Sequence, residues 1–215
     1  MNPMEPLCDD FMLKCTHCFF SGFTCNLRRF RRADDGVAYL EFAVCLPFLM
    51  LLLMGSIEIG RYIIIAQKVE KTTITISDVV SQGQTVSTAD LNNLIYASSQ
   101  VMLPYSMGVN GYVIISSVTQ NGTYSASNPA LVSWQYNSSG TNGSWIQTSH
   151  VGAVGYSAAL PSGMTLNAGD NVIVTEMFYN YLPLITTNGV ISGTTIYKTA
   201  VFKPRLGALS TLSSS

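Results

Sequence analysis

Charged residues are absent from the middle of this 215-residue chain, with no Lys, Arg, Asp or Glu between Leu91 and Gly169. Ser, Thr, Asn, Gly and aromatic residues fill that interval, and His150 is its only titratable base. A cytosolic protein would normally carry charges there for solubility, so the composition is typical of an exported, β-rich domain. The formal net charge of -1, with no basic stripe beyond the first third, gives no reason to expect a nucleic-acid partner.

Cysteine is absent after Cys45, so the second part of the chain has no disulfide and must be held together by packing alone. The other cysteines, Cys8, Cys15, Cys18 and Cys25, all precede the apolar segment described below. The run Cys15-Thr-His-Cys18 has the C-x2-C spacing that places two thiolates on one face of a zinc ion, but a second such pair is absent. Inert thiols, reversible lipidation and, less favoured, zinc binding are the alternatives for these cysteines.

Catalytic motifs are absent as well, since the sequence has no G-x-S-x-G, P-loop, H-E-x-x-H or nucleotide fingerprint. General acid–base chemistry needs paired carboxylates or a positioned histidine. The carboxylates of the second part are scattered, at Glu70, Asp78, Asp90, Asp170 and Glu176. His150 lies in a Ser/Thr-rich segment typical of a surface loop or strand edge. We therefore expect neither an enzyme nor a cofactor nor a metal site.

The aromatic residues of the uncharged interval leave two uses open. Trp134, Tyr136 and Trp145 are the candidates for a sugar or protein contact patch. Core packing explains aromatic residues in a strand-rich domain more often, so we expect them to pack.

A continuous apolar segment is the strongest feature that is present. Residues 37–57 contain one charge, Glu41, and as a helix these 21 residues would extend roughly 31 Å, which matches a hydrocarbon core of about 30 Å. A soluble helix is rarely apolar on every face for this length, so the segment predicts a membrane span in a lipid bilayer. A cleaved secretory signal fits poorly, because the segment is too long and no small-x-small site closes it.

Arginines set the expected orientation of this span. The polar leader ends in Arg28-Arg29-Phe30-Arg31-Arg32, and the positive-inside rule counts basic residues, so the leader is expected in the cytoplasm. The predicted organisation is a cytoplasmic leader at 1–36, a transmembrane helix at 37–61, an exported domain at 62–205 and a polar tail at 206–215. The chain is therefore expected to cross the membrane once, with the C-terminal domain on the side opposite the cytoplasm.

Two helices are expected in all. The first continues past the apolar segment, because residues 67–80 fit an amphipathic helix, although their β-branched residues weaken it. After a linker at 81–86, Ser87-Thr-Ala-Asp90 has the pattern of a capping box and predicts a second, short helix that ends before Pro104.

Strands follow from Gly108 onward. The expected strands are 112–119, 131–136, 171–181 and 194–202, with 137–144 a loop by composition. Asn121-Gly122 is a hairpin signal, and 171–181 is apolar on both faces, which favours a central place in the sheet. The fold class is therefore α+β: a long N-terminal helix, transmembrane in its first half, a short second helix, and an antiparallel sheet packed on helix.

The entry to the span carries the functional signal. Gly36-Val-Ala-Tyr-Leu-Glu41 places a glycine at the cytoplasmic mouth and a glutamate five residues later. This pattern resembles the class III signal that prepilin peptidases process, which implies a cut between Gly36 and Val37. A glycine suits such a cut, because a membrane protease must draw an extended backbone into its site.

The resemblance extends along the span. Glu41-Phe42-Ala43, Leu46-Pro47 and Glu58-Ile59-Gly60-Arg61 resemble the signature of the TadE-like family of the tight-adherence (Flp) pilus system, over roughly residues 28–70. The resemblance implies a pilin-like fold and the function of a minor pilin or pseudopilin required for assembly of a Flp-type (type IVb) pilus. It implies a location in the bacterial inner membrane, single-pass, with the C-terminal domain in the periplasm or outside the cell. The implied partners are the prepilin peptidase, other pilin-like subunits and the inner-membrane platform of the pilus machinery. Family leaders are often shorter, so Met12 competes with Met1 as the start, and TadE and its sister TadF both fit. The larger TadG type does not, because it carries an extra domain for which this chain has no room.

Several residues of this signature have both a functional and a simpler explanation. Glu41 pairs with the ammonium group of Val37 and sets subunit register, as the resemblance implies, or it extends to the headgroups. Pro47 removes a backbone hydrogen bond and is expected to kink the helix, for filament packing or with no special role. Glu58 and Arg61, with Gly60 between them, form an i,i+3 pair or contact a partner.

Two other functions compete with the pilin hypothesis. One is an uncleaved single-pass anchor that presents an adhesive or ligand-binding domain and keeps residues 1–36. The other is a membrane-tethered hydrolase with an unrecognised site, which would need a charged residue whose loss removes activity without unfolding the domain.

Overall fold

The computed structural model describes residues 35–138, 145–184 and 193–213. The leader, its cysteines and Met12 lie outside the described residues, as does most of the loop expected at 137–144. The chain divides into two compact units between Ile57 and Glu58. Helix α2 (Asp35–Ser81) contributes to both units, which are described separately.

The first unit is the apolar part of α2. Its large apolar side chains are exposed on every face of the helix. Leu51 and Leu52, for example, are 71% and 72% exposed. The helix is long and apolar enough to cross a membrane, and none of its most apolar 18-residue window is buried by protein. A helix that is apolar all round and unburied is in its favourable solvent inside lipid, so it indicates a single membrane span.

The second unit begins with residues 58–81 of α2, followed by α3 (Thr88–Met102) and the short α4 (Met107–Asn110). The predicted capping box starts α3, since the Ser87 hydroxyl accepts the Asp90 N–H at 3.2 Å and the Asp90 carboxylate accepts the Ser87 N–H at 3.2 Å. The hydrogen bond from the Ser87 hydroxyl, followed by the one from the Ser87 backbone N–H, lowers the pKa of Asp90. The helix ends at Met102, two residues before Pro104, as predicted.

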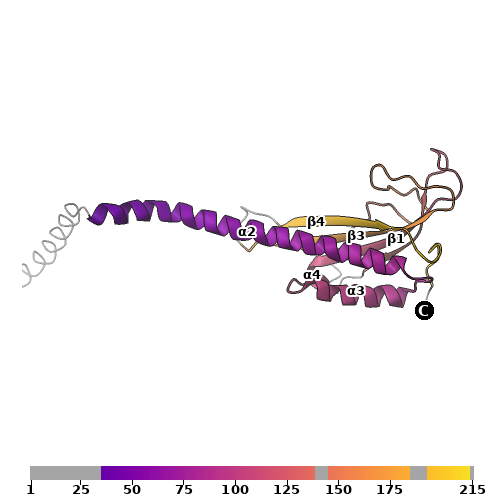
Figure 1. Ribbon diagram of the computed structural model, residues 1–215, viewed down its shortest axis with the longest axis horizontal. Helices are drawn as coiled ribbons and strands as arrows, with labels where there is room; N and C mark the ends of the chain where they lie inside the picture. The colour runs from indigo at the N-terminus through magenta and orange to yellow at the C-terminus, as the bar shows by residue number, and fades with distance from the viewer. Residues whose placement is uncertain (1–34, 139–144, 185–192, 214–215) are drawn as a thin grey trace, which may run out of the picture. The chain divides into compact units, whose positions relative to one another are not determined.

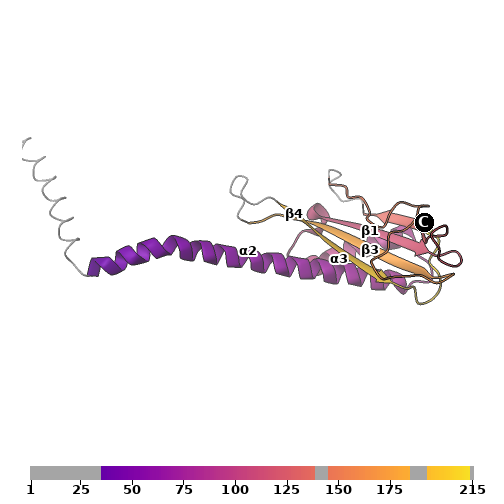
Figure 2. The same ribbon diagram turned by 90° about the horizontal axis from the view of Figure 1, so that it is seen from above.

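The sheet has four antiparallel strands in the order β2-β1-β3-β4. They are β1 (Gly111–Thr119), β2 (Leu131–Asn137), β3 (Asn171–Tyr181) and β4 (Thr194–Phe202). In the register, Val113 of β1 lies opposite Met177 of β3, which lies opposite Lys198 of β4. The central position predicted for residues 171–181 is confirmed, and the strands run along the second half of α2 (Figure 2).

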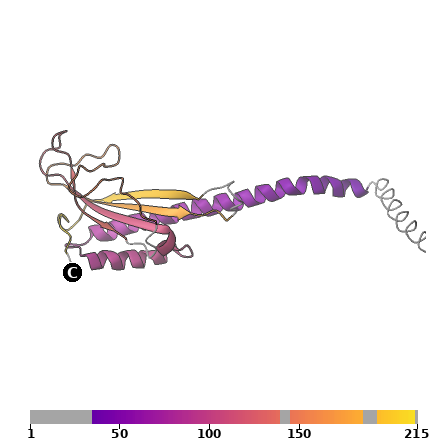
Figure 3. The same cartoon turned by 180° about the vertical axis from the view of Figure 1, so that it is seen from behind.

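Helices cover one face of the sheet, and α3 lies beside α2 on it (Figures 1 and 3). The core on that face joins residues of α2 such as Val69 and Ile76 to Val113, Ile173 and Met177 of the two central strands, all 0% exposed. A run of loops covers the other face with a smaller core around Val118 and Val174. Because successive strand residues point to opposite faces, β1 and β3 are buried on both sides.

These elements confirm the α+β, pilin-like arrangement expected from the sequence. The hairpin signal at Asn121-Gly122 needs a correction. β1 and β2 do pair, but residues 120–130 connect them, so this dipeptide does not form a two-residue turn between the strands. Gly122 has φ +90, and Gln120 Nε2 donates to the Gly122 carbonyl at 3.0 Å, so the dipeptide makes a local turn inside a longer loop.

The end of the chain packs against the domain. Leu209 is 2% exposed, and its carbonyl accepts hydrogen bonds from the Ser117 hydroxyl at 2.7 Å and the Trp134 indole at 2.8 Å. Its N–H donates to the Asn171 side chain at 3.0 Å. Residues 206–213, expected as a polar tail, therefore hold a buried anchor, and Trp134 packs in the core as expected.

Candidate functional site

All the site residues predicted from the sequence lie on α2. Gly36, Val37, Glu41 and Pro47 belong to the first unit, and Glu58, Gly60 and Arg61 follow at the start of the second. Glu41 is exposed one turn after Val37 and makes no ion pair with any described residue. The helix continues through Pro47. Cleavage after Gly36, the role of Glu41 in register and a kink at Pro47 remain predictions.

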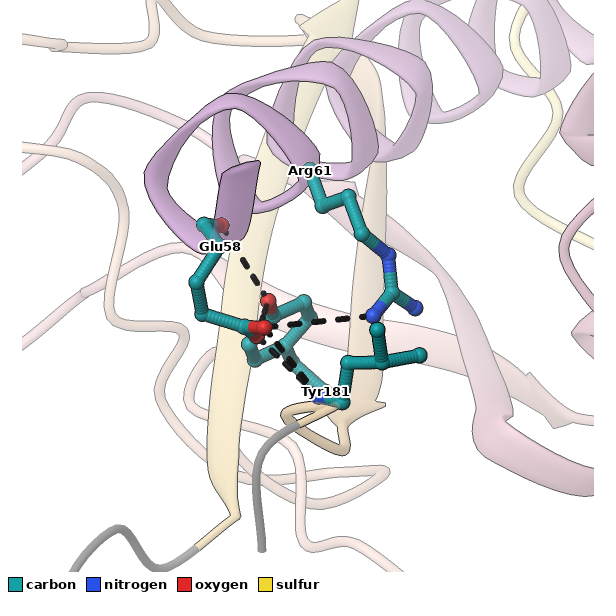
Figure 4. A network of polar contacts seen from close by, with 4 residues as sticks. Glu58, Arg61 and Tyr181 are labelled. Carbon is teal, nitrogen blue, oxygen red and sulfur yellow. Dashed lines mark hydrogen bonds and ion pairs between the residues drawn. The ribbon is translucent and has the colours of Figure 1, made fainter. Parts of the chain in front are cut away.

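Glu58 and Arg61 meet the end of β3. Figure 4 shows their side chains and that of Tyr181 turned toward one another, two from one turn of α2 and one from the sheet. The Tyr181 hydroxyl donates to the Glu58 carboxylate, and the Leu184 N–H donates to the same carboxylate at 3.2 Å. Arg61 Nη1 lies 3.9 Å from Glu58 Oε2, an ion pair beyond hydrogen-bond distance.

Burial strengthens this cluster. The side chain of Glu58 is 14% exposed and Tyr181 is 4% exposed, so their hydrogen bond is shielded from water. Desolvation, followed by the hydrogen bond to Glu58, raises the pKa of Tyr181 to about 12. The phenol therefore stays protonated near neutral pH and remains a donor to the carboxylate. A charge-assisted hydrogen bond of this kind is stronger than one between neutral groups.

Tyr62 completes the contact one residue beyond Arg61. Its ring meets the Tyr181 ring edge-on, with centroids 5.3 Å apart. Aromatic pairs in this geometry add about 0.5–1.5 kcal/mol beyond their buried area. One turn of α2 thus fixes the end of β3 through both a polar and an aromatic contact.

Gly60 has no packing partner that explains it. A Cβ built on Gly60 meets nothing within 4 Å among the described atoms, and Gly55 is equally open. Glycine in a helix interior costs about 1 kcal/mol relative to alanine. The fold of the second unit therefore does not require Gly60, and its open side is available for close approach of another molecule.

A second polar cluster, centred on Glu176, was not found from the sequence. Glu176 in β3 is 0% exposed, and its carboxylate accepts hydrogen bonds from the Ser149 hydroxyl, from the His150 N–H at 2.9 Å and from the Tyr197 hydroxyl at 2.9 Å. Desolvation, followed by the hydrogen bond to Glu176, raises the pKa of Tyr197. A lone carboxylate inside an otherwise apolar strand was the available signal for a buried, hydrogen-bonded group.

This second cluster holds a loop on the sheet. His150 is exposed. Its ring contacts the Tyr197 ring at a tilt of 47°, with centroids 4.5 Å apart, and meets the Phe178 ring edge-on, with centroids 5.4 Å apart. All three partners of Glu176 are donors already used in binding it. The cluster therefore fastens the loop around residues 149–151 to β3 and β4.

Comparison with protein families finds a match over residues 36–73 to the model described as TadE-like protein. No curated protein and no solved structure matches the chain. The matched segment contains Glu41, Pro47 and the Glu58–Arg61 turn, and ends within the part of α2 that packs on the sheet. TadE-like proteins are typically non-enzymatic and belong to pilus machinery. Residues 36–73 of this chain therefore form a TadE-like family domain, which indicates a pilus-associated, pilin-like protein.

Proposed function

We propose that the chain is a minor pilin or pseudopilin required for assembly of a Flp-type pilus. In this proposal a prepilin peptidase cuts between Gly36 and Val37, the leader faces the cytoplasm, and the domain at 62–205 is exported. The protein acts by contact with other pilin-like subunits and with the inner-membrane platform, and performs no chemistry itself.

The single observation that carries the proposal is the TadE-like match beginning at Gly36. The fold adds support, because one helix supplies both an exposed apolar segment and a packed spine for an antiparallel sheet. A subunit that must stay in the bilayer and later join other subunits needs both parts in one chain.

Glu41 is the residue through which the proposal explains subunit register. A carboxylate at the centre of a bilayer costs about 2.5–3.5 kcal/mol, and less near its edge. A cut after Gly36 would create an ammonium group on Val37, one helical turn from Glu41. Pairing of the two groups, within one chain or between chains, offsets the cost of burial and favours one axial position of neighbouring helices.

Intact-mass measurement of the protein from host membranes, with the peptidase present, tests the proposal. The wild-type chain is expected to lack its first 36 residues and to begin at Val37, whereas the Gly36→Ala variant is expected to retain the leader. Gly55→Ala is the matched control, because it is the same substitution in the same helix at an open position and should leave cleavage unchanged.

The same measurement distinguishes the proposed pilin from the main alternative, an uncleaved anchor. If wild type, Gly36→Ala and Gly55→Ala all keep residues before Val37, the protein is not a peptidase substrate. An uncleaved single-pass anchor that presents an extracytoplasmic binding domain then becomes the better account of the chain.

A further inference from the structure

A polar cavity lies beside the Glu58–Arg61 turn in the second unit. Its volume is about 250 Å³, and it opens between α2, the segment from Pro104 to Asn110, and the end of β3. The polar residues in its lining are Arg61, Tyr105, Ser106, Asn110, Tyr179 and Tyr181, together with Asn180. No Asp or Glu is among the described residues that line it. The cavity is smaller than the roughly 300–1,000 Å³ of pockets for drug-sized ligands, so it suits a small polar group.

Arg61, which lines this cavity, has a donor nitrogen without an acceptor in the described part of the chain. Its Nη1 atom is buried and has no hydrogen-bond partner among the described residues. The carboxylate of Glu58, which does not line the cavity, is 3.9 Å away and is already bound by Tyr181 and Leu184. The Arg61 side chain lines the cavity and is 29% exposed as a whole, so only this one donor nitrogen is buried. A buried donor without an acceptor is costly, and an acceptor bound in the cavity would reduce that cost.

The neighbouring groups are donors that complement such an acceptor. Tyr179 is 4% exposed, and desolvation raises the pKa of its hydroxyl. A hydrogen bond from the Asn110 side chain lowers this pKa by less than desolvation raises it. Tyr179 therefore keeps its hydroxyl proton near neutral pH and is a donor, whereas the Tyr181 hydroxyl is already used in binding Glu58. A guanidinium fork beside hydroxyl and amide donors is the arrangement that binds phosphate oxygens in proteins.

The place of Arg61 in the sequence points to the source of the phosphate. Arg61 follows the last residue of the apolar run, Ile57, by four positions, a rise of about 6 Å along a helix. The headgroup layer on each side of a bilayer is roughly 5–8 Å thick. With the span in a membrane, the guanidinium lies at the depth of the lipid phosphates.

We propose that this cavity binds the phosphate of a phospholipid headgroup. The proposal rests on the membrane span of the proposed function, and it does not depend on cleavage after Gly36. Lipid phosphate would satisfy the buried Arg61 donor and would fix the depth and rotation of the exported domain at the membrane surface. The carboxylate of Glu58 holds Arg61 and Tyr181 in position for this contact.

Native mass spectrometry of the full chain in mild detergent tests the proposal, with leader and leaderless forms distinguished by their mass in the same spectrum. Phosphatidylglycerol is expected to bind one molecule per chain, and diacylglycerol with the same acyl chains, which lacks the phosphate, is expected to bind at least about tenfold more weakly. Arg61→Gln should weaken phosphatidylglycerol binding by at least about tenfold, and Arg61→Lys by less. Lys71→Gln is the matched control, since it removes one positive charge from an exposed position of the same helix and should leave binding within about twofold.

Three outcomes would overturn the proposal. Equal binding of diacylglycerol would show that acyl chains, not phosphate, hold the lipid. Equal weakening by Arg61→Gln and Lys71→Gln, or none by either, would remove the cavity from the explanation. Inorganic phosphate that binds lipid-free protein as tightly as phosphatidylglycerol does would assign the site to a soluble anion.

A folding control keeps these outcomes interpretable. The fluorescence of Trp134, which is 6% exposed, should be unchanged in Arg61→Gln if the domain is intact. If Arg61→Gln unfolds the domain, Tyr179→Phe removes a single hydroxyl from the cavity with little change in packing. That variant is then expected to weaken phosphatidylglycerol binding by several-fold, and unchanged binding would count against the proposal.

Discussion

The two halves of α2 place similar apolar side chains in opposite surroundings. In residues 37–57, large apolar residues are exposed on every face, and Leu52 is 72% exposed. In residues 58–81, an apolar stripe that includes Ile65, Val69 and Ile76 is buried to 2% exposure or less, while the opposite side carries charges. The helix is continuous through both.

The difference shows that the surroundings, and not the local helix, decide what an apolar residue contributes. In the second half, burial against the sheet removes apolar surface from water and stabilises the fold. In the first half, no described residue removes the same surface from water, and a membrane span would place it in lipid. The first charged residue after Glu41 is Glu58, and it is also the residue that binds the end of the sheet.

The largest expected effect compares the same substitution in the two halves. Ile76→Ala removes a side chain that is 0% exposed and leaves a cavity in the main core, so it should lower the free energy of unfolding by about 2–5 kcal/mol. Ile57→Ala, at a residue that is 46% exposed, should lower it by less than about 0.5 kcal/mol. Denaturant unfolding of the full chain in detergent, followed by tryptophan fluorescence, measures both. Equal effects would mean that the two halves do not differ in packing.

The second prediction concerns membrane insertion, which an introduced charge should disturb in the first half of α2 and not in the second. Leu51→Arg places a charge near the middle of the apolar run and should make membrane insertion less favourable by about 3 kcal/mol, roughly a hundredfold. Ile74→Arg, at a position of the second half that is 44% exposed, should leave insertion unchanged. The fraction of each variant that resists alkaline carbonate extraction from membranes measures insertion. Loss of both variants from the membrane fraction would contradict the division between the halves.

Local sequence rules predicted the elements of this fold well. The Ser87–Asp90 capping box is satisfied within four residues of chain, so its outcome depends little on the rest of the molecule. The apolar character of 171–181 on both faces predicted a central strand, because only burial on both sides of the sheet satisfies it. The apolar run before Glu58 predicted a helix that no described residue covers.

The contacts of the candidate site could not be predicted in the same way. Tyr181 and Glu58 are 123 positions apart, and their meeting depends on the register of β3 against α2, which no local pattern specifies. Glu176 was seen only as one of several scattered carboxylates, because its partners come from a loop and from a different strand. Leu209 was assigned to a polar tail, because the acceptors and donors that bind its backbone come from β1, β2 and β3. Polar contacts between residues far apart in the sequence can be identified only once the fold is known.

The smallest expected effect falls at the boundary of the two halves. Tyr181→Phe removes the phenol that donates to Glu58 and keeps the ring against Tyr62, so it should lower the free energy of unfolding by about 1.5 kcal/mol. Tyr96→Phe is the control, because Tyr96 is 77% exposed and its loss should cost less than about 0.5 kcal/mol.

The pH dependence of this effect follows from the pKa of Tyr181, which is raised from 10.0 to about 12. A group whose pKa is raised on folding contributes its stability fully below the unfolded pKa, and loses it as pH rises through the folded pKa. The difference in unfolding free energy between wild type and Tyr181→Phe should therefore be constant below pH 10 and should shrink between pH 10 and about 12. Unfolding curves at pH 8 and at alkaline pH measure the difference. A difference that stays constant across this window would show that the Tyr181 proton is not held by Glu58, and the boundary turn would then be joined to the sheet by packing alone.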